Sequence, residues 1–201
     1  MNYTKRTEIL IAGGGIVGSL MAIALGENGF DVVLVDPTFE TSIQTKRIFR
    51  SYAISRTSKR LLKNLGVWDN LDPKFQPITK IILSESKKKT SDVTKLAEFN
   101  LQDESDEPTS YMVEDQEIRL ALNHKIGVCK NVEILTNCKV LSEEIAKGGS
   151  IIKLDNGKKI FASLFVISDG PNSSIAKGIN KKFISKDYNQ VAIVANVKHK
   201  N

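Results

Sequence analysis

The sequence has few of the residues that cross-link a fold or hold a metal ion. Among its 201 residues are two cysteines, Cys129 and Cys138, and two histidines, His124 and His199. Their spacing fits neither a disulfide framework nor a zinc site. We therefore expect no metal centre, and we expect each cysteine to be a small buried apolar residue or a bystander to any chemistry.

Long apolar runs are missing as well. No stretch is long enough to cross a bilayer as a helix, and the polar residues 1–8 lack the basic and then apolar layout of a secretory signal. Hydrophobic residues make up 41% of the chain and charged residues 26%, as in ordinary globular proteins. We expect a cytoplasmic protein with one sizeable domain, or one domain and a piece of another.

Acidic residues are outnumbered, which leaves a net charge of +6. A basic balance can indicate binding to nucleic acid or to an anionic membrane. The lysines are scattered, however, and the densest run, Lys87-Lys88-Lys89, has no interleaved aromatic residues on which bases could stack. We expect no nucleic-acid partner and a solvated basic surface, with a membrane-facing role as the alternative.

The first 36 residues have the pattern strand, tight turn, helix, strand. Residues 8–12 and 31–35 are short apolar runs, typical of strands buried on both faces in a parallel sheet. The helix between them is expected to end near Asn28, where Gly29 follows as a C-cap glycine. Its expected buried face is a stripe at helical spacing. That stripe consists of Val17, Leu20, Met21, Ala24 and Leu25.

The turn has the sequence Gly13-Gly14-Gly15-Ile16-Val17-Gly18, a G-x-G-x-x-G motif between a strand and a helix. Gly13 permits the sharp turn, Gly15 lets the main chain approach a pyrophosphate, and Gly18 lets helix and strand pack closely. The phosphates would then meet the unpaired N–H groups and the positive end of the helix dipole. These six residues are predicted to bind a dinucleotide cofactor.

Asp36 ends the second strand. Its carboxylate is predicted to accept hydrogen bonds from both ribose hydroxyls of an adenosine and to repel a 2′-phosphate, which favours FAD or NAD over NADP. The alternative is a glycine turn in an α/β protein without a nucleotide, in which Asp36 is a surface carboxylate.

Two further motifs follow. The apolar strand at residues 164–168 leads into Asp169-Gly170-Pro171-Asn172-Ser173, which places an acid and a glycine at the sheet edge where ligands bind. Arg50, before a helix expected at 58–65, could pair with a phosphate. Each has a plain alternative: a strand-end turn for Asp169 and Gly170, and a surface arginine beside a helix N-cap for Arg50.

The rest of the chain is expected to alternate strands and helices. A helix is also expected at 116–125, and Asn156-Gly157 predicts a hairpin turn between 151–154 and 159–161. Further strands are expected at 78–84, 111–113, 132–136 and 191–197.

In the order and placement of these three motifs, the chain resembles the class A FAD-dependent aromatic monooxygenases. Four segments resemble the ubiquinone-biosynthesis hydroxylases within that class, over the N-terminal part of their length. These are Arg50-Ser51-Tyr52-Ala53-Ile54-Ser55, Leu65-Gly66-Val67-Trp68, Tyr111-Met112-Val113-Glu114 and the run from Tyr188 to Val197.

The resemblance implies an α/β fold: a Rossmann-like, three-layer FAD/NAD(P)-binding domain with a mostly parallel sheet, plus part of a small β-rich substrate domain. The expected boundaries are 1–75 and 110–180 for the FAD-binding domain, and 76–109 and 181–201 for the partial substrate domain. It also implies that Gly13, Gly15 and Gly18 hold the FAD pyrophosphate and Asp36 the adenosine ribose.

By the same resemblance, Arg50 lies along the FAD, and Asp169 and Gly170 serve both FAD and the reducing pyridine nucleotide. The implied reaction is hydroxylation of a prenylated phenol or benzoquinol with NAD(P)H and O2, with possible peripheral association with the inner membrane. The flavin carries that chemistry, so no catalytic acid, base or nucleophile is assigned.

The chain departs from this family at three places. Ala176 stands where the family has an arginine, Asp115 stands where relatives often carry Asn, Gln or Arg, and the later Gly-Asp motif is absent. Two alternatives therefore stay open. One is a truncated or split-gene fragment that at most binds FAD, with a second chain supplying the C-terminal half. The other is an NAD-dependent oxidoreductase.

Overall fold

The computed structural model describes residues 3–39, 50–71, 74–86, 93–100, 107–171, 173–178, 184, 186–195 and 197. Lys87-Lys88-Lys89, Asn172 and His199 lie outside these ranges. The helices and strands follow in the order β1 (Lys5–Ala12), α1 (Ile16–Glu27), β2 (Val32–Asp36), β3 (Ser51–Ser55), α3 (Arg56–Asn64), the 3-10 turn η1 (Trp68–Asn70), β4 (Phe75–Ile78), β5 (Lys80–Ser86), β6 (Val93–Asn100), β7 (Ser110–Glu114), α4 (Asp115–Val128), β8 (Val132–Thr136), β9 (Val140–Ala146), β10 (Gly149–Leu154), β11 (Lys159–Ile167) and α5 (Ser174–Gly178).

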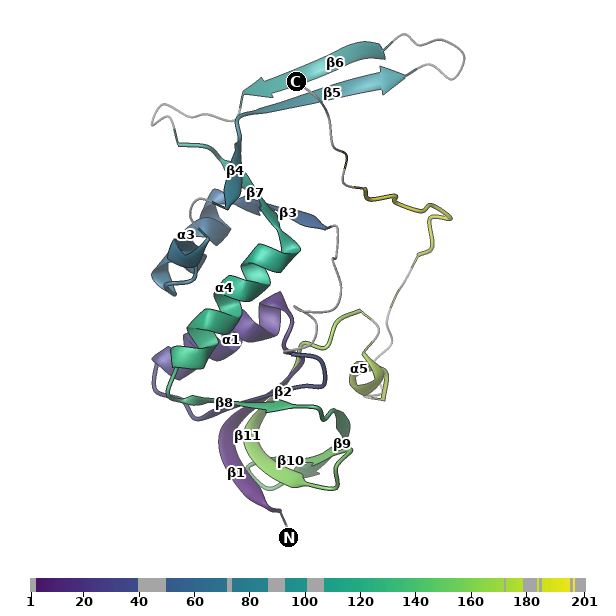
Figure 1. The fold of residues 1–201 in the computed structure, drawn as a ribbon. Coiled ribbons are helices and arrows are strands. Elements are labelled where there is room, and N and C mark those ends of the chain that lie inside the picture. The colour runs from purple at the N-terminus through teal and green to yellow at the C-terminus, as the bar shows by residue number, and fades with distance from the viewer. Residues whose placement is uncertain are drawn as a thin grey trace.

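The largest sheet has the strand order β8-β2-β1-β11-β10-β9. Strands β8, β2, β1 and β11 run parallel, and β10 and β9 continue the sheet antiparallel. Helices α1 and α4 lie side by side over one face of this sheet (Figure 1). The α/β class with a mostly parallel sheet, predicted from the sequence, is confirmed.

The parallel strands β1 and β2 carry continuous apolar segments because both faces of the sheet are covered there. In β1, Ile9 and Ile11 pack into the cluster formed with α1 and α4, whereas Leu10 and Ala12 pack on the opposite face with residues of β9, β10 and β11. Successive side chains of a strand point to opposite faces, so a strand between two layers needs apolar residues at every position. The continuous apolar run at 9–12 is a direct consequence.

The buried face of helix α1 matches the predicted one only in part, since Leu20 and Leu25 pack against the core but two other predicted residues do not. Val17 is 69% exposed and Met21 is 40% exposed. The helix instead packs through residues that include the small Gly18, Ser19 and Gly26. A Cβ atom at Gly26 would lie 2.6 Å from a Val132 methyl carbon, so this helix sits too close to the sheet for larger side chains. The prediction was wrong for Val17 and Met21, because the buried face is turned toward Ala22 and Ile23, which are fully buried.

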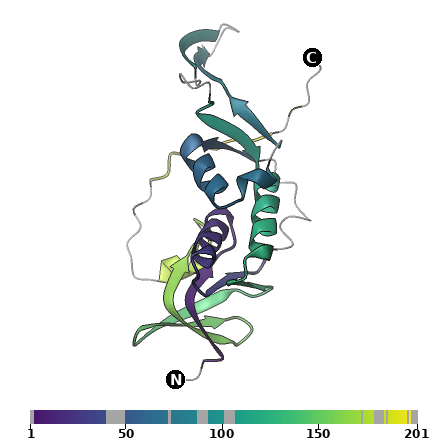
Figure 2. The ribbon, with the colours of Figure 1, turned by 90° about the vertical axis from the view of Figure 1, so that its left-hand side faces the viewer.

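A second sheet, β3-β7-β4, lies beyond α4, and the β5–β6 ribbon forms the end of the molecule farthest from the large sheet (Figures 1 and 2). Trp68, Phe75 and Tyr111 pack together beside α3, with ring centroids 4.9–5.4 Å apart. The β5–β6 ribbon, in contrast, exposes most of its large apolar side chains. These are Ile81, Ile82, Leu83, Val93, Leu96 and Phe99.

Several strand boundaries differ from the predicted ones. The segments expected at 159–161 and 164–168 are one strand, β11, and strands β3, β4, β6 and β9 were not predicted. The strand expected at 191–197 is absent from the described residues there, where Val191 and Ile193 are exposed. A strand forms only when a neighbour pairs with its main chain. Among the described residues no helix is both long and apolar enough to cross a bilayer.

Candidate functional site

The register of the parallel strands brings three predicted motifs to one edge of the sheet. Ala12, the last residue of β1, lies opposite Val35 of β2 and Ile167 of β11. Asp36 at the end of β2, and Gly13 and Ser168, which directly follow β1 and β11, therefore meet at the carboxyl ends of the strands. In open α/β sheets this edge is where ligands bind.

The glycine loop leaves no room for a side chain at two of its glycines, Gly13 and Gly18. Gly13 has a φ of +104°, which a side chain would strain, and a Cβ atom there would lie 2.5 Å from the Ser168 carbonyl oxygen. A Cβ atom at Gly18 would collide with the Gly13 carbonyl oxygen. Ser168 fastens the loop further, because its hydroxyl donates to the carbonyl oxygens of Ala12 and Gly13 at 3.0 and 2.9 Å. The predicted packing requirement for Gly13 and Gly18 thus has a direct structural cause.

Gly15 differs from both, because a Cβ atom added to it would meet nothing within 4 Å. As the N-cap of α1, Gly15 lies where the helix presents its unpaired N–H groups, and the first turn carries no acidic side chain. The main chain here faces open space, not protein. The loop therefore fits a diphosphate, which needs close access to main-chain amides.

Asp36 is bound to the loop across from it. Its Oδ2 accepts a 2.6 Å hydrogen bond from the Gly14 N–H, and its Oδ1 accepts from the N–H and the hydroxyl of Thr38 at 2.7 and 3.0 Å. Each carboxylate oxygen can accept more than one hydrogen bond. Asp36 can therefore hold the loop and still accept from a ligand hydroxyl.

Two adjoining cavities open at this edge. One, of about 300 Å³, is lined by Asp36 and Asp169 together with the apolar side chains of Val35, Val140 and Ile175. The other, of about 280 Å³, is lined by Gly13, Gly14, Gly15, Asp36, Asp169 and Gly170, among others. The first combines carboxylates with an apolar wall, as an adenosine requires, and the second contains the glycine loop.

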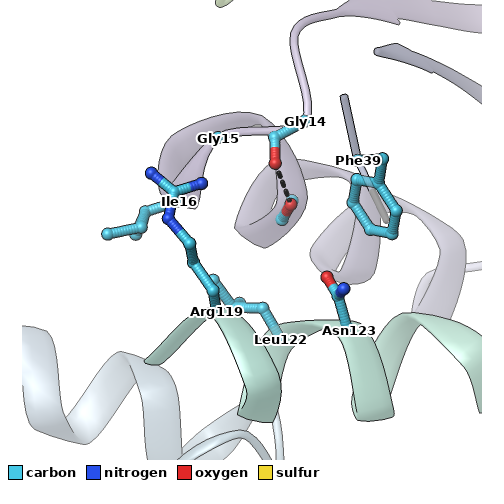
Figure 3. Close-up of a pocket in the computed structure, with 8 residues that line it drawn as sticks. Gly14, Gly15, Ile16, Phe39, Arg119, Leu122 and Asn123 are labelled. Carbon is cyan, nitrogen blue, oxygen red and sulfur yellow. Dashed lines mark hydrogen bonds between the residues drawn. The ribbon is translucent and has the colours of Figure 1, made fainter. Parts of the chain in front are cut away.

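Arg119 is a lining residue that the sequence did not single out. Its side chain rises from α4 toward the Gly15–Ile16 segment, and Phe39 stands on the other side of Gly14 (Figure 3). Its Nε donates a 2.7 Å hydrogen bond to Oδ2 of Asp115, one turn earlier on the helix. The i,i+4 spacing of an acid and an arginine was the available signal, but it is common on solvated helix faces.

Three predicted residues line neither these cavities nor the small pocket beside Arg119: Val17, Arg50 and Gly18, the last of which is packed against Gly13. The guanidinium carbon of Arg50 lies 5.2 Å from the centre of the Tyr52 ring, and the Arg50 carbonyl accepts from the Asp115 N–H at 2.8 Å. Neither Arg50 nor the exposed Val17 is among the described residues that line the cavities. Ile16 lines the small pocket beside Arg119.

Parallel strands, a glycine loop opening a helix and an acid after the second strand define a dinucleotide-binding α/β protein. Comparison with known families agrees, since residues 6–201 match the model of the FAD binding domain. The chain belongs to that family.

Its relatives confirm the resemblance to ubiquinone-biosynthesis hydroxylases. The chain is 30% identical over 196 residues to the ubiquinone hydroxylase UbiL of Rhodospirillum rubrum, covering 97% of this chain and 44% of that protein. It is 29% identical over 207 residues to the mitochondrial ubiquinone biosynthesis monooxygenase COQ6 of Caenorhabditis elegans, covering 96% and 44%. The chain thus spans less than half the length of these relatives.

Solved structures show the same fold. PqsL, a probable FAD-dependent monooxygenase from Pseudomonas aeruginosa, superposes with a TM-score of 0.73 at 18% identity, covering 92% of this chain and 48% of that one.

Proposed function

We propose that this chain binds the adenosine-diphosphate half of FAD at the edge formed by β1, β2 and β11. The diphosphate would lie against the Gly13-Gly14-Gly15-Ile16-Val17-Gly18 segment, and the adenosine ribose against Asp36. The observation that carries the proposal is the open space beside the main chain at Gly15. At the neighbouring glycines of the loop, the space for a side chain is already occupied by protein atoms. The FAD binding domain match supports the choice of FAD.

The residues of the site would divide the work. The N-terminus of α1 supplies N–H donors and a positive potential to the phosphates, and Asp36 and Asp169 supply acceptors for hydroxyl groups. Val140 and Ile175 offer apolar surface to the adenine. Arg50, whose guanidinium lies over the Tyr52 ring, would lie along the FAD.

We propose further that the site belongs to a flavin monooxygenase that hydroxylates a prenylated phenol or benzoquinol of ubiquinone biosynthesis. Bound FAD would supply the oxygenating chemistry, with NAD(P)H as reductant and O2 as co-substrate. The names of the relatives support this substrate class. A prenylated substrate also supports loose association with a membrane surface.

The proposed division of the chain is 1–75 and 110–180 for the FAD-binding domain, and 76–109 and 181–201 for part of a substrate domain. The β5–β6 ribbon supports it, because an isolated two-stranded ribbon with exposed apolar side chains is marginally stable alone. A larger β unit would cover those side chains.

The second candidate is binding of FAD without turnover by the 201-residue chain, with a second chain supplying the remaining part of the enzyme. The chain matches 44% of the length of UbiL, so turnover has to be tested on this chain itself. Two measurements on the purified chain separate the candidates: flavin absorbance retained after gel filtration, and NAD(P)H oxidation after FAD is added. Binding with oxidation supports the monooxygenase, and binding without oxidation supports the second candidate. NAD binding without any flavin binding would contradict both and favour an NAD-dependent oxidoreductase.

A further inference from the structure

We propose that Arg119 is a phosphate ligand of this dinucleotide site, and that Asp115 and Tyr52 are the residues that position it. The proposal rests on the proposed FAD binding and adds a cation to a loop that otherwise offers only main-chain donors. It assigns a role to a residue on α4, an element outside the sequence motif.

The first observation is the way in which Arg119 is held. Asp115 is 2% exposed, and both of its carboxylate oxygens are occupied. Oδ2 accepts from Nε of Arg119 and Oδ1 accepts from the Tyr52 hydroxyl, each at 2.7 Å. A buried carboxylate is stable only when it is paired and hydrogen-bonded, so this arrangement fixes the arginine as well as the acid.

The protonation states agree with that arrangement. Burial and the hydrogen bond to Asp115 raise the pKa of Tyr52, so the phenol stays a neutral donor. Burial alone would lower the pKa of Arg119, but the hydrogen bond and the charge of Asp115 outweigh it and raise that pKa. The arginine is therefore a permanent, oriented cation.

The second observation is where the guanidinium points. Arg119 donates to Asp115 through its Nε, and the end of the Arg119 side chain lies beside the Gly15–Ile16 segment (Figure 3). Arg119 lines the small pocket at Gly14, Gly15 and Ile16 and also the adjoining cavity of about 280 Å³. Its planar, two-pronged donor geometry matches a phosphate.

The third observation is the charge of that cavity. Asp36 and Asp169 place two carboxylates on it, and among its described lining residues Arg119 is the one basic side chain. A diphosphate entering beside two carboxylates needs a compensating cation. The carboxylates are suited to hydroxyl groups, which leaves Arg119 for the phosphates.

The test compares ligands with and without phosphates. Dissociation constants for FAD, ADP and adenosine are measured for the wild-type chain, for Arg119→Met and for Arg60→Met. The last is a matched control on the exposed face of α3. Loss of Arg119 should weaken FAD and ADP by about ten- to a hundredfold, the range for a charged hydrogen bond, and leave adenosine unchanged. Arg60→Met should change none of the three.

Removing Arg119 leaves the buried Asp115 without its cation, so Asp115→Asn/Arg119→Met serves as the companion variant that keeps the site neutral. It should melt closer to the wild-type chain than the single variant and still lose the preference for ADP over adenosine. A wild-type preference in either folded variant overturns the proposal for Arg119 while FAD binding stands. Failure of the wild-type chain to bind FAD or ADP overturns the proposed function and this inference together.

Discussion

The Gly14 N–H donates a 2.6 Å hydrogen bond to Oδ2 of Asp36, which joins the glycine loop to the end of β2. The same carboxylate accepts from Thr38 through its other oxygen. Asp36 is thus part of the architecture of the loop as well as the proposed ligand of the ribose. Its substitution should affect both the loop and the cofactor.

Replacing Asp36 with Ala should weaken FAD binding by about 1.5–3 kcal/mol, the range for hydrogen bonds to a charged group. Quenching of flavin fluorescence on titration with the chain measures this change. Thr38→Ala is the control, because it removes one donor to Asp36 and leaves the carboxylate in place. An unchanged dissociation constant in Asp36→Ala would exclude this carboxylate from the site.

Gly15 and Gly18 should respond in opposite ways to a side chain. Gly15→Val should leave the melting temperature close to that of the wild-type chain, because the new side chain meets open space, yet it should abolish FAD binding by filling the approach to the main chain. Gly18→Ala should lower stability by about 1–3 kcal/mol, since its Cβ atom collides with the Gly13 carbonyl oxygen.

Thermal melts without cofactor and FAD titrations, run on both variants, separate the two effects. Normal FAD affinity in a folded Gly15→Val variant would show that the diphosphate does not lie at this loop.

The conformation of the glycine loop could be predicted from the sequence because its glycines are required by contacts within the strand, turn and helix of the motif and with the neighbouring strand. Gly13 and Gly18 are required by close contacts with main-chain atoms of Ser168 and Gly13, respectively. The spacing of the glycines in the sequence therefore predicts the shape of the turn. The buried face of α1 was not predictable in the same way. Its close packing selects small residues such as Ser19 and Gly26, which an apolar stripe does not reveal.

Asp169 follows β11 and lines both cavities with Asp36. Asp169→Asn should weaken FAD binding by about 1 kcal/mol, less than Asp36→Ala, because an amide keeps one acceptor oxygen. Equilibrium titration with FAD measures the change, and Asp187→Asn, in the exposed segment near the C-terminus, is the control. An effect of equal size in both variants would mean that the loss of charge, not of a ligand, is responsible.

Glu107 should make stability depend on acid pH. The hydrogen bond from Lys59, 3.1 Å long, lowers the pKa of Glu107 from its ordinary value of 4.5. A carboxyl whose pKa is lower in the folded state stabilises the fold above its unfolded pKa and loses that contribution as the pH falls through its folded pKa. Urea unfolding of the wild-type chain and of Glu107→Gln should therefore differ at pH 7, and the difference should shrink as the pH falls below 4.5, the ordinary pKa of the group. A difference that grows as the pH falls below 4.5 would contradict this assignment.

Arg119 shows where sequence reasoning reached its limit. Arg50 is predicted from the sequence as a residue that could pair with a phosphate, and this stays a prediction, whereas the structure brings a second arginine, Arg119, to the glycine loop. Arg119 reaches Gly15 only because α4 packs beside α1. Its direction is set by Asp115, one turn earlier on the same helix, and by Tyr52 of β3, which is distant in the sequence. Such a contact depends on tertiary packing that no local spacing encodes.

A crystal of the 201-residue chain soaked with FAD tests the cofactor site most directly. Density for the diphosphate should lie against the main chain at Gly15, with the adenosine ribose within hydrogen-bonding distance of Asp36. Density for FAD at another place, with the glycine loop empty, would contradict the central claim.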